Sequence, residues 1–129
     1  MTKTWRAAWA ALGIGYVFVW ALGQTVIPDP VQGIFAQTCA AIGCHSGNHP
    51  AKSLNLEPAK VIASAVNVPS RQVISLKIID PKSPGKSYLL MKVRGDKKIV
   101  GLRMPKGRDP LTADEIQALK DWIESLADR

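Results

Sequence analysis

The chain has 129 residues, enough for one domain and too few for two of ordinary size. Hydrophobic residues make up 47% of it, and 17 lysine and arginine residues against 10 acidic ones give a formal net charge of +7. This composition excludes an acidic disordered chain and a low-complexity or collagen-like chain, and two cysteines are too few for a disulfide-dense scaffold. All ten acidic residues lie between Asp29 and Asp128, so the N-terminal segment differs from the rest.

This N-terminal segment carries no charge from Ala7 to Ile27. As a helix rising about 1.5 Å per residue, the run spans roughly 30 Å, the thickness of a bilayer core. Lys3 and Arg6 precede it and no basic residue follows before Lys52, a bias that places the N-terminus in the cytoplasm. The sequence therefore predicts three parts: a cytoplasmic N-terminus (1–6), a transmembrane signal anchor (7–27) and an exported domain (28–129).

A cleavable signal peptide is the second interpretation of the segment, with Ala21-Leu22-Gly23 as the small-residue cleavage site. Either interpretation exports the same domain, whose 15 basic and 10 acidic residues give a net charge of +5. The charge bias thus predicts a single-pass membrane protein with this domain on the side away from the cytoplasm.

The exported domain has the pattern of short helices joined by long connections. Apolar residues at a 3.6-residue spacing predict a helix over 31–41, and Pro58 at a first helical position predicts a short one over 58–65. A third helix is expected between Ser83-Pro84 and Gly95. Residues 67–82 show no clear period and no convincing strand.

The last predicted helix has the clearest local signals. Thr112 and Glu115 form a capping-box pattern at its start. An apolar stripe follows, made of Ile116, Leu119, Ile123 and Leu126. About 100 residues with only short helices make a thin core, so the long loops need something further to pack around.

Both cysteines lie in one seven-residue window, Cys39-Ala-Ala-Ile-Gly-Cys44-His45. C-x-x-C-H is the attachment signature of c-type haem, in which two thiols add to the haem vinyl groups and the adjacent imidazole binds the iron. Here the Cys44-His45 end is intact, but four residues rather than two separate the cysteines. Gly43 gives the backbone the freedom to loop out the two additional residues.

A second iron ligand is expected from the opposite face of the haem. His49 follows His45 too closely to reach around, and Met91 lies inside the third predicted helix, where methionine is most often core. Met104 lies in a Gly- and Pro-bounded loop just before the last helix. Methionine and histidine ligation gives a raised reduction potential and a six-coordinate iron suited to electron transfer.

The exported domain resembles class I c-type cytochromes, especially single-haem domains of bacterial multi-domain cytochromes. Four stretches carry the resemblance, in this order: Ile34-Phe35 with Cys39 and Cys44-His45, Pro81 to Leu90, Arg103-Met104-Pro105, and Leu111 to Ile123. The resemblance implies an all-α cytochrome c fold wrapped around one covalent haem c and preceded by the transmembrane helix. It also implies attachment at Cys39 and Cys44, proximal ligation by His45, distal ligation by Met104, and a crossing of the first and last helices near Phe35 and Trp122.

The implied function is electron transfer by a membrane-anchored monohaem c-type cytochrome, and not catalysis, because a methionine-capped iron has no open position for substrate. The implied location is the bacterial inner membrane, as a single-pass protein with the haem domain on the periplasmic side. Such a chain is expected to be a subunit or tethered carrier of a larger redox complex: a photosynthetic reaction centre, a quinol-oxidising complex or an oxidase. A haem-based sensor or small catalytic haem domain is an alternative. Others need no haem: a zinc-binding interaction module using Cys39, Cys44, His45 and His49, or a small-loop disulfide.

Basic residues are concentrated between Lys82 and Arg108, where nine lysine and arginine residues accompany one acid, Asp96. The cluster flanks the expected methionine ligand. A basic rim of this kind steers acidic redox partners in a salt-dependent way. Acidic docking surfaces on redox proteins are therefore the expected partners, within a hetero-oligomeric complex, with anionic lipid headgroups as a second candidate; nucleic acid is not expected on the exported side.

Overall fold

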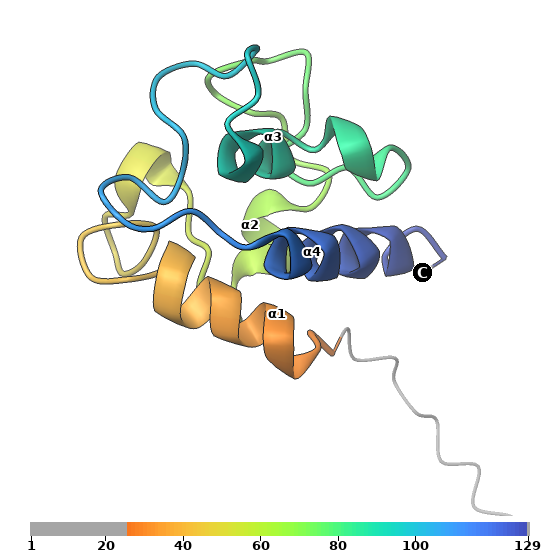
Figure 1. Cartoon of the computed structure of the whole chain (residues 1–129), viewed down its shortest axis with the longest axis horizontal. Coiled ribbons are helices and arrows are strands. Elements are labelled where there is room, and N and C mark those ends of the chain that lie inside the picture. The colour runs from red at the N-terminus through yellow and green to blue at the C-terminus, as the bar shows by residue number, and fades with distance from the viewer. Residues whose placement is uncertain (1–25, 129) are drawn as a thin grey trace, which may run out of the picture.

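Four short α-helices and three further helical turns account for the regular structure of residues 26–128, the part of the chain that the computed structural model describes (Figure 1). The α-helices are α1 (Asp29–Gly33), α2 (Val61–Ala65), α3 (Tyr88–Arg94) and α4 (Ala113–Ser125). The turns are a π-helix, Ile34–Cys39, and two 3₁₀ turns, Ala51–Ser53 and Pro84–Lys86. Within this range no strand forms, and only two isolated bridges join residues 66–69 to 77–79.

The first predicted helix forms as α1 with the π-helix directly behind it, over residues 29–39 rather than 31–41. It begins earlier than predicted because Asp29 and Pro30 suit a first helical turn, where an acidic side chain meets the positive end of the helix and proline needs no N–H partner. It ends with a wider turn, in which the Ala40 N–H donates to the Phe35 carbonyl at 2.7 Å.

The capping box predicted for the last helix is confirmed in α4. The Thr112 hydroxyl accepts from the Glu115 N–H at 3.2 Å, and the Glu115 carboxylate accepts from the Thr112 N–H at 2.8 Å. Both bonds satisfy amide groups that would otherwise lack partners at the start of the helix. Leu119, Trp122 and Ile123 then bury the inward face of α4.

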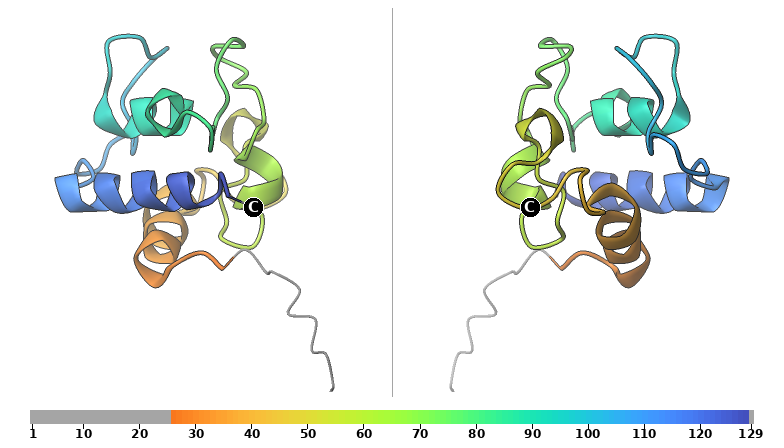
Figure 2. Two further views of the ribbon diagram at one scale, coloured as in Figure 1. Left: turned by 90° about the vertical axis from the view of Figure 1, so that its right-hand side faces the viewer. Right: turned by 90° about the vertical axis from the view of Figure 1, so that its left-hand side faces the viewer.

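The crossing of the first and last helices is also observed. Phe35, fully buried, packs edge-to-face on Trp122, with the ring centroids 5.4 Å apart and the planes at 73°. Both views in Figure 2 show the segment from α1 to the π-helix lying against α4. This contact anchors the π-helix, and with it Cys39 at its end, to the longest helix described.

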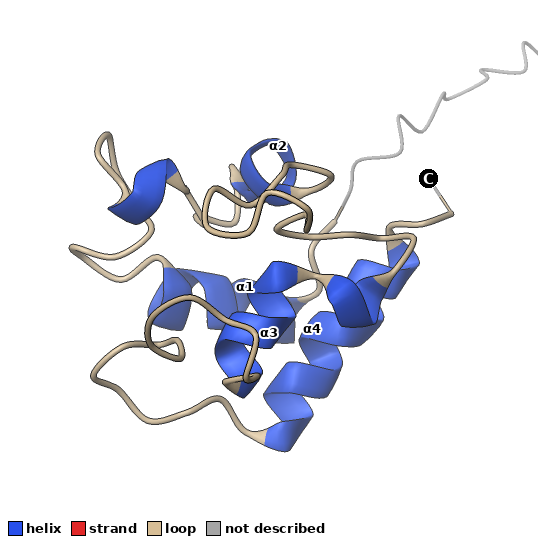
Figure 3. Cartoon of the chain, turned by 90° about the horizontal axis from the view of Figure 1, so that it is seen from above, coloured by secondary structure: helices blue, strands red, loops and turns tan. Residues whose placement is uncertain are grey.

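The two middle helices are shorter than predicted. Val61 rather than Pro58 begins α2, and the third predicted helix is broken at Ser87, whose backbone is extended. The fully buried Ser87 hydroxyl accepts from the Asp80 N–H at 2.9 Å, so a contact with a residue seven positions earlier in the same connection breaks the local helical pattern. Loops fill most of the chain between the helices (Figure 3).

The expected fold class, an all-α cytochrome c fold preceded by one transmembrane helix, was wrong as stated, and so was the expected location as a single-pass inner-membrane protein. Among residues 26–128 no helix has the length and apolar character needed to cross a membrane. The longest, α4, has 13 residues, whereas a span needs about 20.

The described end of the predicted anchor gives a physical reason for the correction. Val26 and Ile27 are not helical. Ile27 is buried in the core of the domain, and its carbonyl accepts from the Gln32 side chain at 2.7 Å. The uncharged run therefore extends into residues that pack with α1. The predicted N-terminus (1–6), and residues 7–25 of the predicted anchor, lie outside the described residues.

Candidate functional site

The Cys39–His45 segment forms a tight loop directly after the π-helix. The His45 N–H donates to the Cys39 carbonyl at 3.1 Å, and the Cys44 N–H donates to the Ala41 carbonyl at 2.9 Å. Ile42 is fully exposed, and Gly43 has a φ of +79°, a conformation that favours glycine. The additional residues between the cysteines are thus looped out towards solvent, as Gly43 predicted.

His45 is oriented by backbone carbonyls of the loop that follows it. Its Nδ1 lies 3.1 Å from the Ala51 carbonyl oxygen and 3.2 Å from that of Leu54. Both carbonyls accept, so they select the tautomer in which Nδ1 carries the proton and Nε2 keeps a free lone pair. Metal-binding histidines are typically held in this way, with the non-binding ring nitrogen donating to a carbonyl.

The Glu57 carboxylate holds together the loop that follows His45. The carboxylate accepts from the Lys60 ammonium at 2.9 Å, and from the Gly47 N–H and the Asn55 side chain at 3.2 Å each. These hydrogen bonds, that of Lys60 first, hold the pKa of Glu57 below its ordinary value. The Leu56 N–H, next to Glu57, donates to the His45 carbonyl at 2.7 Å, so this end of the loop is also bonded to the backbone of His45.

Cys39 and Cys44 are both free thiols and both partly buried. Burial, with a smaller contribution from the nearby Cys44, raises the pKa of the Cys39 thiol to about 12. Cys39 therefore stays a neutral thiol at neutral pH. An environment that lowers a thiol pKa, which a nucleophilic cysteine needs, is not present at this position.

Met104 approaches from the other side of the molecule, on the loop between α3 and α4. Its N–H donates to the Lys92 carbonyl at 2.9 Å, which ties it to α3. At the far end of the loop, the Arg108 guanidinium donates to the Gln37 carbonyl at 3.0 Å, which ties the loop to the π-helix. The loop that carries Met104 is therefore attached to the wall that carries Cys39.

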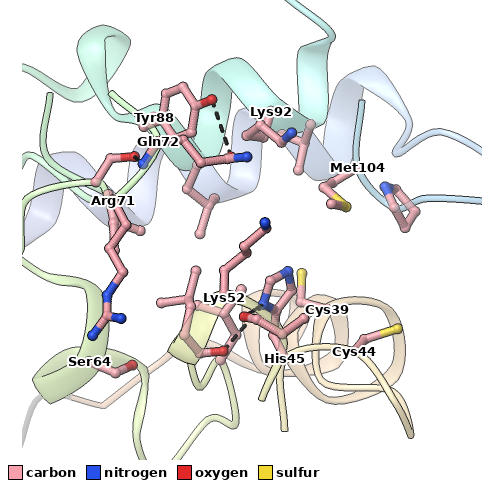
Figure 4. Close-up of a pocket in the computed structure, with 18 of the residues that line it drawn as sticks. Cys39, Cys44, His45, Lys52, Ser64, Arg71, Gln72, Tyr88, Lys92 and Met104 are labelled. Carbon is pink, nitrogen blue, oxygen red and sulfur yellow. Dashed lines mark hydrogen bonds between the residues drawn. The ribbon is translucent and has the colours of Figure 1, made fainter. Parts of the chain in front are cut away.

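Cys39, Cys44, His45 and Met104 all line one cavity of about 620 Å³. Figure 4 shows Cys39, Cys44 and His45 on one side of it and Met104 on the other. Apolar side chains cover much of the remaining wall: Leu54, Leu56, Val68, Ile78, Leu89, Val93 and Leu111. Both the volume and the apolar lining with a few polar groups are typical of cofactor sites.

The residues present fit a covalently attached haem. Two thiols and an imidazole with a free Nε2 lie on one wall, and a thioether lies on the opposite wall. Those are the donors that a c-type haem with histidine and methionine ligands requires. The cavity also supplies the apolar surroundings that a porphyrin plane needs.

The rival ligands lie elsewhere. His49 is exposed, and neither His49 nor Met91 lines the cavity. For the zinc interpretation, the described residues contain no group of three or more histidine, cysteine or acidic side chains placed to hold a metal ion. The structure thus brings together the four residues that the haem interpretation predicts and not the four of the zinc interpretation.

Three residues whose side chains bind the loops around the cavity, Glu57, Tyr88 and Lys92, were missed by sequence reasoning. Glu57 left a weak signal, since it is the only acid between Asp29 and Asp80. Tyr88 and Lys92 are four residues apart and so share a helix face, but no local pattern indicates which loop that face binds.

Comparisons of the chain with protein-family models, with curated proteins and with solved structures found no match. The residues and geometry described above are therefore the whole basis for assigning a function to this cavity.

Proposed function

We propose that this domain binds one haem c covalently and transfers single electrons, as a monohaem c-type cytochrome. The observation that carries the proposal is the convergence of Cys39, Cys44, His45 and Met104 on one cavity, from segments up to 65 positions apart in the sequence. Cys39, Cys44 and His45 lie together because they are close in the sequence. The arrival of Met104 on the opposite wall requires the fold.

Each side chain has a separate task in this proposal. The Cys39 and Cys44 thiols would hold the haem through two thioether bonds; addition of each S–H across a vinyl group would need no oxidant or reductant. His45 offers the Nε2 lone pair, and the Ala51 and Leu54 carbonyls hold its ring in place. Met104 offers its sulfur from the opposite side. When bound, the haem iron supplies one-electron oxidation and reduction.

The same ligand set supports a carrier rather than an enzyme. If the His45 imidazole and the Met104 thioether both bind the iron, no position on it would remain open for a substrate. The apolar walls lower the polarity around the site, which together with a sulfur ligand would favour the reduced form and a raised potential.

Acidic redox proteins are the proposed partners. The basic residues between Lys82 and Arg108 are almost all exposed or partly exposed, and the single acid among them, Asp96, is paired with Arg94 at 2.7 Å. The uncompensated positive charge surrounds the loop that carries Met104. Such a surface accelerates encounters with an acidic partner, within a larger redox complex, and the effect falls with added salt.

The absorption spectrum of the native reduced protein tests this function, with the chain produced in a host that attaches haem to c-type cytochromes. We expect a low-spin, six-coordinate spectrum that carbon monoxide leaves unchanged. Ready carbon monoxide binding would instead indicate the sensor or catalytic haem domain. A chain that shows no haem stain on a denaturing gel would refute the proposal altogether.

A further inference from the structure

We propose that Lys92 is the positioning residue for Met104, because it fastens the loop of residues 95–104 to α3 and so holds the sulfur at the cavity. This inference rests on the proposed function for the role of the sulfur. The fastening itself is a property of the chain that can be measured separately.

Lys92 contacts the loop at three points. Its ammonium donates to the Val100 carbonyl at 2.9 Å and to the Leu102 carbonyl at 2.6 Å, and its own carbonyl accepts from the Met104 N–H at 2.9 Å. A single residue thus satisfies alternate peptide groups along the stretch that ends at Met104. Hydrogen bonds from a charged donor are about twice as strong as neutral ones.

Tyr88 strengthens the attachment from one turn earlier on the same face of α3. Its hydroxyl accepts from the Val100 N–H at 2.9 Å and donates to the Gln72 side chain at 3.4 Å. Because Tyr88 is 5% exposed, its ring is fixed by the core and its hydroxyl is a rigid anchor. The N–H and the carbonyl of Val100 are therefore both bonded to side chains of α3.

The turn that starts the loop brings it back over the helix. Gly95 ends α3 with a φ of +75°, and a Cβ there would lie only 2.9 Å from Arg103 Cδ. The positive φ favours glycine at this turn, and the turn brings the returning part of the loop within reach of Lys92. The chain geometry and the lysine bonds therefore act on the same stretch.

A positioning residue matters here because a thioether is a neutral ligand with weak affinity, held on an irregular segment. Ordering each loop residue costs about 1–2 kcal/mol of conformational entropy. If the loop is already ordered by Lys92, that cost does not fall on the bond between sulfur and iron, as in other preorganised sites. Figure 4 shows the Lys92 and Met104 side chains on the same side of the cavity.

The test compares three variants of the full chain. Lys92→Leu removes the donating ammonium and keeps both the backbone carbonyl and an apolar stem at the cavity wall. Lys97→Leu is the matched control, because Lys97 lies exposed in the same loop and its side chain makes no hydrogen bond to the described residues. Lys92→Arg is the conservative variant, which keeps charge and donors.

The first readout is the affinity of the haem-loaded protein for added imidazole, which competes with the sulfur. We expect Lys92→Leu to bind imidazole roughly tenfold more tightly than the unaltered protein, the change expected from losing a hydrogen-bonded charged donor. Lys97→Leu should leave this affinity unchanged, and Lys92→Arg should restore much of the resistance. Equal affinities for Lys92→Leu and Lys97→Leu would overturn the positioning role.

The second readout does not depend on haem. Amide hydrogen exchange at Val100 and Met104 should be faster in Lys92→Leu than in Lys97→Leu, since the bonds of both amides depend on a closed loop. Unchanged exchange would overturn the fastening. If the chain carries no haem, the proposed function and the role of Met104 fail together, while the exchange rates still decide whether Lys92 fastens the loop.

Discussion

His45 and Met104 face the same cavity, but different groups hold them there. The His45 ring is fixed by two backbone carbonyls within nine positions of it, so its orientation follows from the local loop. Met104 is placed by α3, through residues that sequence spacing does not connect to it. This difference explains why the grouping of Cys39, Cys44 and His45 is readable from the sequence, whereas the position of Met104 needed the fold.

Replacing the proposed sulfur ligand should change the iron site directly. In Met104→Ala we expect a lower reduction potential and an iron that binds carbon monoxide, because the thioether that favours the reduced state is gone. Redox titration and a carbon monoxide difference spectrum measure both effects. Met91→Ala is the matched control and should leave both unchanged, since Met91 does not line the cavity. The reverse pattern would reassign the ligand to Met91.

Glu57 should make the loop that holds His45 sensitive to acid. Its pKa in the folded protein is lowered from 4.5, mainly by the hydrogen bond with Lys60, so it stabilises the fold above that pH and loses this effect as the pH falls through the lowered value. We expect Glu57→Gln to unfold at a lower temperature than the unaltered chain at neutral pH, with the difference shrinking in acid. Thermal melts across this range measure it.

Two outcomes distinguish this effect of Glu57 ionisation from a loss of packing in the Glu57→Gln variant. Lys60→Met should move the acid transition to higher pH, because it removes the largest contribution to the lowered pKa of Glu57. A difference between Glu57→Gln and the unaltered chain that stays constant from neutral pH into acid would contradict it.

The helices were predictable to the extent that their ends depend on nearby residues. Both bonds that begin α4 lie within four residues, and its start was predicted correctly. The start of α3 depends instead on the buried Ser87 hydroxyl and its bond to Asp80, seven residues earlier in the connection that leads into the helix. A break caused by one side-chain bond of this kind leaves no periodic signal, which is why the sequence predicted one continuous helix there.

The capping box at the start of α4 allows the contribution of a local contact to stability to be measured. Thr112→Ala should lower the free energy of unfolding by about 1 kcal/mol, because it leaves the Glu115 N–H without its acceptor. Thr112→Ser keeps the hydroxyl and should lose only a few tenths of that value. Denaturant unfolding of both variants is the measurement, and equal losses would show that the methyl group rather than the cap is responsible.

For the whole molecule, the sequence indicated a core too thin for the length of its loops, and the structure has a cavity where those loops meet. A porphyrin held in this cavity by the four donors would supply the core that the short helices lack. The apolar N-terminal segment was the misleading feature. Its uncharged run predicted a membrane span, but its described end, Val26 and Ile27, is not helical, and Ile27 packs into the domain.

The central claim is that one haem is covalently bound to this chain. The intact mass of the protein under denaturing conditions tests it most directly, because only a covalently attached group stays with the chain when the fold is lost. We expect a mass increased by one haem, with Cys39→Ala and Cys44→Ala together returning the mass to that of the polypeptide. A denatured chain with no added mass, after production in a host that attaches haem to other c-type cytochromes, would contradict the account.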